Sequence, residues 1–185
     1  LDGISVVDFS RLIAGPCATD LLAAMGAAVI KVESPDGDPM RLTRSKEAGG
    51  GPTAPTFAAF NVLKQTVALD LKRPQDLQRA RTLCISADVV VEAFRPGVMD
   101  RLGLGAAELR KANPGLVYAA LSAFGEDGPE RARGGVDIVL QAETGLMSVT
   151  GDSGPMKAGV PIIDAASAMA LAAFRSSMPR VRWLS

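Results

Sequence analysis

The sequence predicts an α/β fold in which helices flank a parallel β-sheet. Runs rich in β-forming residues alternate with helical patterns along the chain, which is the order of elements in α/β proteins. The first strand, helix and second strand follow one another within about thirty residues, the length of a βαβ unit with parallel strands. The chain has 185 residues, of which 48% are hydrophobic, so it can form the core of one domain or of a large part of one.

The first predicted unit combines a strand, a turn, a helix and a second strand. Residues 4–9 are expected to form the first strand because they are rich in β-forming side chains. An amphipathic helix is expected over residues 17–25, with Pro16 in its first turn, where a missing N–H costs little. Gly26 is expected to end this helix, and residues 28–32 to form the second strand.

The rest of the chain continues the alternation. Period-2 or continuous apolar runs indicate strands, and apolar residues spaced by three or four indicate helices. We expect strands over residues 66–70, 88–92 and 116–121, helices over 74–85, 106–112 and 138–146, a turn with a short helix over 95–103, and an extended piece over 147–150.

The βαβ unit raises the possibility of nucleotide binding. Glu33 ends the second strand, where dinucleotide-binding folds place the acid that binds ribose. The G-x-G-x-x-G fingerprint is missing, however, which argues against a nicotinamide cofactor and leaves Glu33 as a solvated residue at a strand end. The long connection that follows carries Arg41, Arg44 and Lys46, which predict either a phosphate-facing loop or solvated charge.

Composition excludes several classes of function. Twenty basic residues balance twenty acidic ones and aromatics make up 4%, so neither nucleic acid nor a membrane surface is an expected partner. Histidine is absent, which removes histidine-based catalysis and histidine metal ligands. Cys17 and Cys84 lie in apolar helical patterns and are expected as buried small residues, with no metal site. Without a signal-like or membrane-spanning segment, we expect a cytoplasmic enzyme or binding protein.

Asp164 is the main candidate for chemistry. It is the single carboxylate in an apolar run over residues 160–174. Residues 160–163 are expected as a short strand or a buried lead-in, and an alanine-rich helix begins at Ala165. Asp164 is therefore expected at a helix start, either as an N-cap or as a carboxylate nucleophile at the edge of the core.

Five stretches of the sequence, in the same order, carry a resemblance to a known family. They are residues 1–9 with Ala14-Gly-Pro16, residues 26–33, residues 91–103, Gly134-Gly-Val-Asp137, and Gly159-Val-Pro-Ile-Ile-Asp164. Together they resemble the N-terminal part of family III CoA-transferases, the group that also contains the α-methylacyl-CoA racemases. The resemblance implies an incomplete Rossmann-like domain over residues 1–174 that binds coenzyme A, and an interlocked homodimer in the full-length form.

The resemblance also implies a reaction. Asp164 matches the family's catalytic aspartate, which in the transferases attacks an acyl-CoA, becomes an aspartyl-CoA thioester through a mixed anhydride, and passes CoA to a carboxylic acid acceptor. Racemases pair this aspartate with a histidine at the position of Val136, and valine cannot move a proton. CoA transfer is therefore favoured. An acyl-CoA racemase or epimerase, and a non-catalytic CoA-binding fragment, remain as alternatives.

Several further residues match family positions near coenzyme A. Arg101 matches an arginine near the adenosine phosphates, and Leu102 beside it lines the base. Lys64 matches a lysine expected at phosphate, although the usual arginine after it is a glutamine here. Arg11 and Ile13 match positions close to the active site. Because some members carry glutamine at the position of Ile13, a polar dicarboxylate such as oxalate is not the expected acceptor.

The last residues of the sequence depart from the family pattern. Residues 175–185 contain three arginines and no acid, with Pro179 where a helix is expected to continue. Family members are about twice as long as this chain. We therefore expect a divergent tail that reflects truncation or a shifted reading frame.

Overall fold

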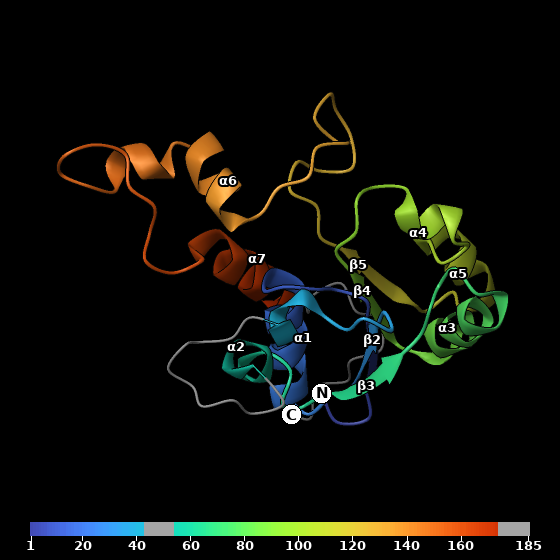
Figure 1. The fold of residues 1–185 in the computed structure, drawn as a ribbon. Helices are drawn as coiled ribbons and strands as arrows, with labels where there is room; N and C mark the ends of the chain where they lie inside the picture. Colours follow the sequence, from blue (N-terminus) through green and yellow to red (C-terminus); the bar gives the residue numbers. More distant parts are fainter. Residues whose placement is uncertain (43–53, 174–185) are drawn as a thin grey trace, which may run out of the picture.

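The fold is built on a parallel β-sheet, seen edge-on among the helices in Figure 1. The computed structural model describes residues 1–42 and 54–173. Within these residues five strands pair in the order β3-β2-β1-β4-β5, and every pairing is parallel. The strands are β1 (Ser5–Asp8), β2 (Ala28–Glu33), β3 (Gln65–Ala68), β4 (Val89–Glu92) and β5 (Val117–Ala120). The predicted α/β class and all of the strands predicted over residues 4–121 are confirmed.

The strand order reverses at β1, which pairs with β2 on one side and with β4 on the other. Val7 lies opposite Ile30 in β2 and Val90 in β4. The chain moves outward from β1 to β2 and β3, then returns to place β4 and β5 on the opposite side. In open parallel sheets, a crevice forms at the carboxyl ends of the strands at such a reversal, and ligands bind there. The expected location of a site is thus the gap between the loops that follow β1 and β4.

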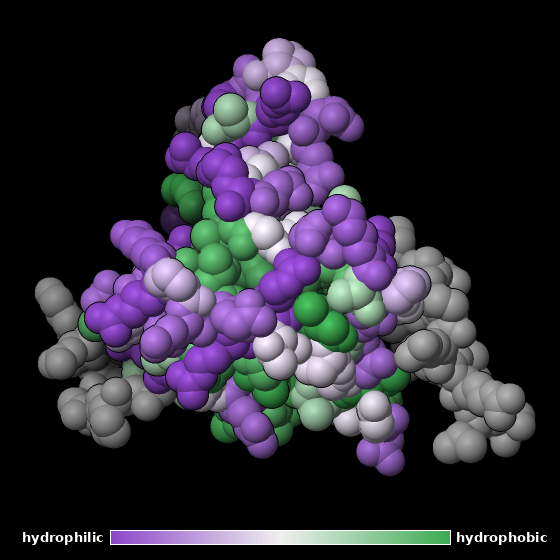
Figure 2. All heavy atoms as spheres, turned by 90° about the vertical axis from the view of Figure 1, so that its right-hand side faces the viewer, coloured by the Kyte–Doolittle hydropathy of each residue, from purple (hydrophilic) through white to green (hydrophobic). Residues whose placement is uncertain are grey.

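Two layers of helices cover the sheet, as Figure 1 shows. One face packs on α3 (Pro74–Ser86), α4 (Val98–Arg101) and α5 (Ala106–Ala112), around a core that includes Phe9 and Val90. The other face, with Val6 and Val29, packs on α1 (Ala14–Ala24) and α7 (Ile162–Ala173). Strand residues therefore alternate between two cores, as buried parallel strands do. Figure 2 shows mostly hydrophilic atoms on the side of the molecule that carries α3, α4 and α5.

Local sequence explains where several helices begin and end. Pro74 is the first residue of α3 and Pro16 the third of α1, positions at which the missing proline N–H has no helical acceptor. Gly26 follows the end of α1 with φ +98°, a left-handed conformation that other residues adopt at a cost. The predicted helix over 106–112 is confirmed as α5.

The segment between β5 and α7 leaves the sheet and projects from the body of the molecule in Figure 1. It contains α6 (Asp137–Glu143) and η2 (Leu146–Val149), and then returns so that α7 lies against α1. The extended piece predicted over 147–150 is wrong, because a 3₁₀ turn follows the left-handed Gly145. The strand or buried lead-in predicted over 160–163 is also wrong, because Val160 is exposed and the helix already begins at Ile162.

Two short helices between β2 and β3, η1 (Pro39–Leu42) and α2 (Pro55–Ala59), contact each other. The tail predicted over 175–185 lies outside the described residues, as do Arg44 and Lys46. None of the helices in the described part of the chain has the length and apolar character needed to cross a bilayer.

Candidate active site

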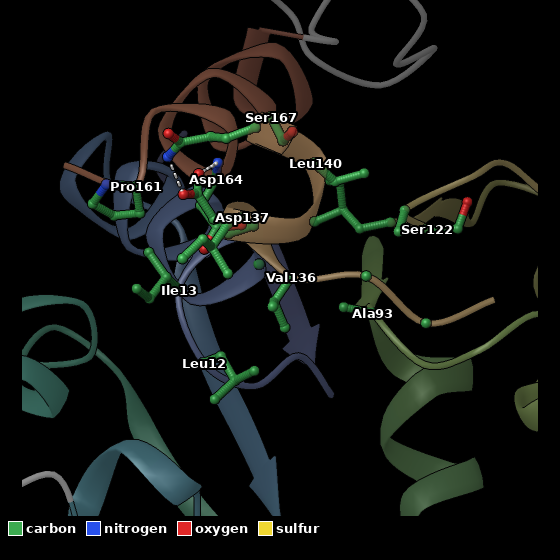
Figure 3. A pocket seen from close by; sticks show the side chains of 18 of the residues that line it. Leu12, Ile13, Ala93, Ser122, Val136, Asp137, Leu140, Pro161, Asp164 and Ser167 are labelled. Atoms are coloured by element: carbon green, nitrogen blue, oxygen red, sulfur yellow. Dashed lines mark hydrogen bonds between the residues drawn. The ribbon is translucent and has the colours of Figure 1, made fainter. Parts of the chain in front are cut away.

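A cavity of about 530 Å³ lies where the strand order reverses. The loop after β1, the loop after β4, the start of α6 and the first turn of α7 all contribute to its wall, together with residues 157–161. Figure 3 shows Asp164 and Asp137 close together in it, with Ile13 and Pro161 beside them. The site thus lies where a doubly wound sheet leads us to expect one.

Asp164 enters the cavity as the third residue of α7. Its side chain is half-buried, and within residues 1–42 and 54–173 its carboxylate makes no hydrogen bond or ion pair. Burial, and to a smaller extent the neighbouring charge of Asp137, raise the pKa of Asp164 to about 6. Asp164 is not the N-cap of α7, since it lies inside the first turn.

The capping role predicted for Asp164 belongs to Asp137 instead. It is the first residue of α6, and its Oδ1 accepts hydrogen bonds from the backbone N–H groups of Ile163, at 2.8 Å, and Asp164, at 3.2 Å. These are two of the N–H groups that have no acceptor within their own helix. A carboxylate from another helix therefore caps α7 and places the backbone of Asp164.

Gln141 extends this arrangement by one step. Its side chain is buried, and its Nε2 donates a hydrogen bond to Oδ2 of Asp137, one helical turn earlier in α6. Its Oε1 accepts the backbone N–H of Ala158 at 2.8 Å. The pair Asp137–Gln141 joins α6, the segment before α7 and the first turn of α7. The sequence alone does not assign this role: Asp137 lies in the Gly134-Gly-Val-Asp137 motif, and no local pattern marks Gln141.

Of the residues expected at coenzyme A, two line the cavity with Asp164. Ile13 lies near Asp164 in Figure 3, and Arg11 stands in the same wall with its guanidinium 5.4 Å from the ring centre of Phe94. Val136, the position of the racemase histidine, also lines the cavity. The loop after β1 therefore serves the same site as α7.

Lys64, Arg101 and Leu102 lie outside the cavity lining. The side chain of Lys64 is fully buried and donates to Asp8 at 3.2 Å, to the carbonyl of Pro16 at 2.8 Å and to Asn61 at 3.0 Å. Burial lowers the pKa of Lys64, and Asp8 acts against this. All three ammonium protons are thus used inside the protein, an environment that differs from the one expected of a phosphate ligand.

Arg101 and Leu102 differ from each other in exposure. Arg101 is the exposed last residue of α4, whereas Leu102 is partly buried against the core beneath it. A phosphate could reach the guanidinium of Arg101 from solvent without displacing any partner that the described residues supply.

Buried charges lie under the loop that follows β1. Oδ1 of Asp8 accepts the backbone N–H and hydroxyl of Ser10, and Oδ2 accepts the hydroxyl of Thr19 at 2.6 Å. Beside it, Lys31 and Asp38 form a second buried ion pair with an N–O distance of 3.0 Å.

The structure contradicts both roles predicted for Glu33 at the end of β2. It is buried, and its carboxylate holds Arg41 through two hydrogen bonds of 2.7 and 2.8 Å. Glu33 is therefore neither available to bind ribose nor solvated, and the charge of Arg41 is neutralised within the fold.

The two cysteines form no disulfide. Cys84 is buried, as expected, and Cys17 is half-buried. The described residues contain no group of three or more His, Cys, Asp or Glu side chains that could hold a metal ion.

The sequence matches the model of the family described as CoA-transferase family III over residues 1–175. The chain belongs to this family. Its family III relatives include the probable fatty acyl-CoA transferase Rv3272 of Mycobacterium tuberculosis, 43% identical over 93% of this chain, and the succinate–glutarate CoA-transferase of Agrobacterium fabrum, 40% identical over 89% of it. The resemblance seen in the sequence motifs is thus confirmed.

Solved structures of family III proteins share the fold. The orthorhombic form of Rv3272 superposes with a TM-score of 0.88 at 42% identity over 94% of this chain. A CaiB/BaiF family protein from Brucella suis gives 0.84 at 36% identity over 93% of it. The chain spans 49% and 48% of those two chains, and 44% and 43% of the Mycobacterium and Agrobacterium relatives.

Proposed function

We propose that this chain carries the nucleophile of an acyl-CoA:carboxylate CoA-transferase, and that the nucleophile is Asp164. The observation that carries the proposal is an unpaired, half-buried carboxylate in a cavity at the strand-order reversal of a family III fold. A carboxylate without hydrogen-bond donors keeps its lone pairs available for attack, and partial removal from water makes it more nucleophilic.

The proposed reaction needs only one group of the protein, the carboxylate of Asp164. The Asp164 carboxylate attacks the thioester carbonyl, CoA leaves as thiolate, and a mixed anhydride forms. The thiolate attacks the aspartyl carbonyl of the anhydride, which releases the donor acid and leaves an aspartyl-CoA thioester. The acceptor carboxylate then attacks this thioester, the thiolate leaves and attacks the acceptor's carbonyl in the new anhydride, and acyl-CoA departs as the Asp164 carboxylate is restored.

The alternative of racemisation needs a second base beside Asp164. Val136 occupies the position of the racemase histidine and has no proton to exchange. Asp137 is the nearest other acid, but both of its oxygens already accept hydrogen bonds, from α7 and from Gln141. These contacts favour transfer over racemisation.

In this proposal, exposed arginines bind the phosphates of CoA. Arg101 is exposed at the end of α4, with Leu102 beside it for the adenine, and Arg11 stands at the cavity wall. Lys64 supports the site from beneath through Asp8 and makes no direct phosphate contact, because its three protons are engaged. Guanidinium groups suit this task because they bind phosphate oxygens in pairs.

Trapping the covalent intermediate tests the proposal. The purified chain is incubated with acyl-CoA and then with hydroxylamine, which converts an activated aspartyl group to a hydroxamate that peptide mass spectrometry locates. We expect the modification at Asp164, and none in the Asp164→Asn variant. An Asp152→Asn variant, changed at an exposed position outside the cavity, should be modified like the unchanged chain. Modification at another acid, or exchange of the α-hydrogen of an acyl-CoA in deuterium oxide, would contradict the proposal.

A further inference from the structure

Basic side chains outnumber acidic ones in the wall of the cavity, although the chain as a whole has equal numbers of both. The basic residues of the lining are Arg11, Arg95, Arg133 and Lys157, and the acids are Asp137 and Asp164. A cleft with an excess of one charge raises the local concentration of ligands of the opposite charge. The lining therefore suits a ligand that carries negative charge.

Two of these cations have no partner in the described part of the protein. The side chains of Arg95 and Lys157 are exposed, and they form no hydrogen bond or ion pair within residues 1–42 and 54–173. Arg133, in contrast, is paired with Glu130 at 2.7 Å and with Glu143. Guanidinium and ammonium groups without protein partners can donate charge-assisted hydrogen bonds to a carboxylate or a phosphate.

The chain leaves room for Arg95 at the cavity wall. A Cβ atom at Gly134 would lie 3.0 Å from Nη2 of Arg95 and 3.4 Å from its Nε, so a side chain there would displace the guanidinium group. Gly134 precedes Asp137, the acid that caps α7 beneath Asp164. One short segment thus places the backbone of Asp164 and also makes space for a free cation in the same cavity.

Apolar side chains stand beside the proposed nucleophile. Val136 is 49% exposed and Leu12 41%, and both line the cavity. In Figure 3, Val136 lies between Asp164 and Ala93, which stands two positions before Arg95. A ligand that reacts at Asp164 and also reaches Arg95 would therefore cross apolar surface on its way. Methylene groups suit such a surface, and an anionic group suits its far end.

We propose that Arg95 and Lys157 form an anion subsite that binds a second anionic group of the acyl-CoA, away from the thioester. The inference rests on the proposed function, because it assumes that an acyl-CoA reaches Asp164. The anionic group is the free carboxylate of a dicarboxylic acyl chain or a phosphate of the CoA moiety, since both offer the paired oxygens that a guanidinium group binds. The apolar surface beside Asp164 favours the carboxylate.

Calorimetric binding of CoA, hexanoyl-CoA and adipoyl-CoA to the purified chain tests the inference. The two acyl chains are of equal length and differ in the free carboxylate of the adipoyl group. We expect adipoyl-CoA to bind at least about tenfold more tightly than hexanoyl-CoA, because charge-assisted hydrogen bonds form to that carboxylate. In the Arg95→Leu and Lys157→Leu variants this preference should shrink or vanish, while the binding of CoA and hexanoyl-CoA stays unchanged.

The three ligands separate the possible outcomes. Equal weakening of all three in the variants would keep the anion subsite and assign it to a phosphate of CoA. Unchanged binding of all three would overturn the inference, and hydroxamate formation at Asp164 would then still support the proposed function. Failure of the unchanged chain to bind any of the ligands would overturn the proposed function as well.

Matched variants separate a local site from the overall charge. Arg131→Leu and Lys72→Leu remove the same charges at exposed positions outside the cavity lining, and they should bind all three ligands like the unchanged chain. Arg95→Lys keeps a cation and should keep part of the preference, and Gly134→Ala should weaken it by displacing the guanidinium group. Equal effects of Arg131→Leu and Arg95→Leu would overturn the inference.

Discussion

Asp8 and Asp164 are the same side chain in two environments of one fold. Asp8 ends β1, is fully buried, and accepts hydrogen bonds from Ser10, Thr19 and Lys64. Asp164 lies in the first turn of α7, is half-buried, and finds another acid, Asp137, as its neighbour. The more buried carboxylate has donors on both oxygens, and the less buried one has none among the described residues.

The difference separates a structural acid from the acid that we propose as the nucleophile. The donors around Asp8 replace the water that it loses on folding, so its charge holds the loop after β1 in place. Asp164 loses water without replacement, and this loss, together with the charge of Asp137, raises its pKa to about 6. Burial alone therefore does not distinguish the proposed nucleophile from the structural acid. The two differ in the number of hydrogen-bond donors that face them.

The largest effect is expected when the structural acid is removed. Asp8→Ala leaves the buried ammonium group of Lys64 without its anion, and loss of one partner of a buried pair costs about 3–5 kcal/mol. The free energy of unfolding in urea measures this. Asp36→Ala, at an exposed position, should change it by less than about 0.5 kcal/mol. Equal effects of the two substitutions would mean that Asp8 is not a structural acid.

A smaller effect of opposite sign on the free energy of unfolding is expected at Asp164, the proposed nucleophile. The pKa of Asp164 is raised from 3.8 to about 6 in the fold, so its charged form opposes folding at neutral pH and this cost disappears as pH falls below the unfolded value. Asp164→Asn should therefore stabilise the chain by about 1 kcal/mol above pH 6, after allowance for solvent screening of a half-exposed group. Thermal unfolding at pH values above 6 and near 4 measures the difference. A gain that does not depend on pH would contradict this assignment.

The smallest effect is expected from a change of Asp137, the acid whose charge raises the pKa of Asp164. Asp137→Asn removes a negative charge while its amide oxygen can still cap α7, so the pKa of Asp164 should fall part of the way from about 6 toward 3.8. Carboxyl carbon resonances of labelled aspartate, followed through a pH titration, measure it. Because burial is the larger cause, a complete return to 3.8 would show that the cavity does not keep water from Asp164.

Most of the fold could be predicted from local sequence. The three valines that begin Val89–Glu92 are typical of a buried strand, and Pro74 and Gly26 mark a helix start and a helix end for clear stereochemical reasons. The errors lie over residues 147–150 and 160–163, where an apolar run contacts little of the core. Val160 and Pro161 line the cavity, and a sequence pattern does not separate a cavity wall from burial in a strand. Residues 147–150 form a 3₁₀ turn in the segment that projects from the sheet.

The site could be predicted only in part. Asp164 stood out because it is one acid in an apolar run, but the cap that places it comes from Asp137, 27 positions earlier. In the sequence, nothing distinguishes Lys64 or Glu33 from any other charged residue at the end of a strand. Only the fold pairs Lys64 with Asp8 and Glu33 with Arg41, which removes both from the set of groups that a ligand could reach.

The sequence by itself determined the parallel α/β architecture, the family and the identity of one acid worth testing, because periodicity, helix breakers and ordered motifs are local properties of the chain. The tertiary structure alone decided which charges are neutralised inside the protein and which face the cavity. That outcome depends on pairs of residues far apart in sequence, such as Asp8 with Lys64, whose meeting is fixed by the packing of strands and helices.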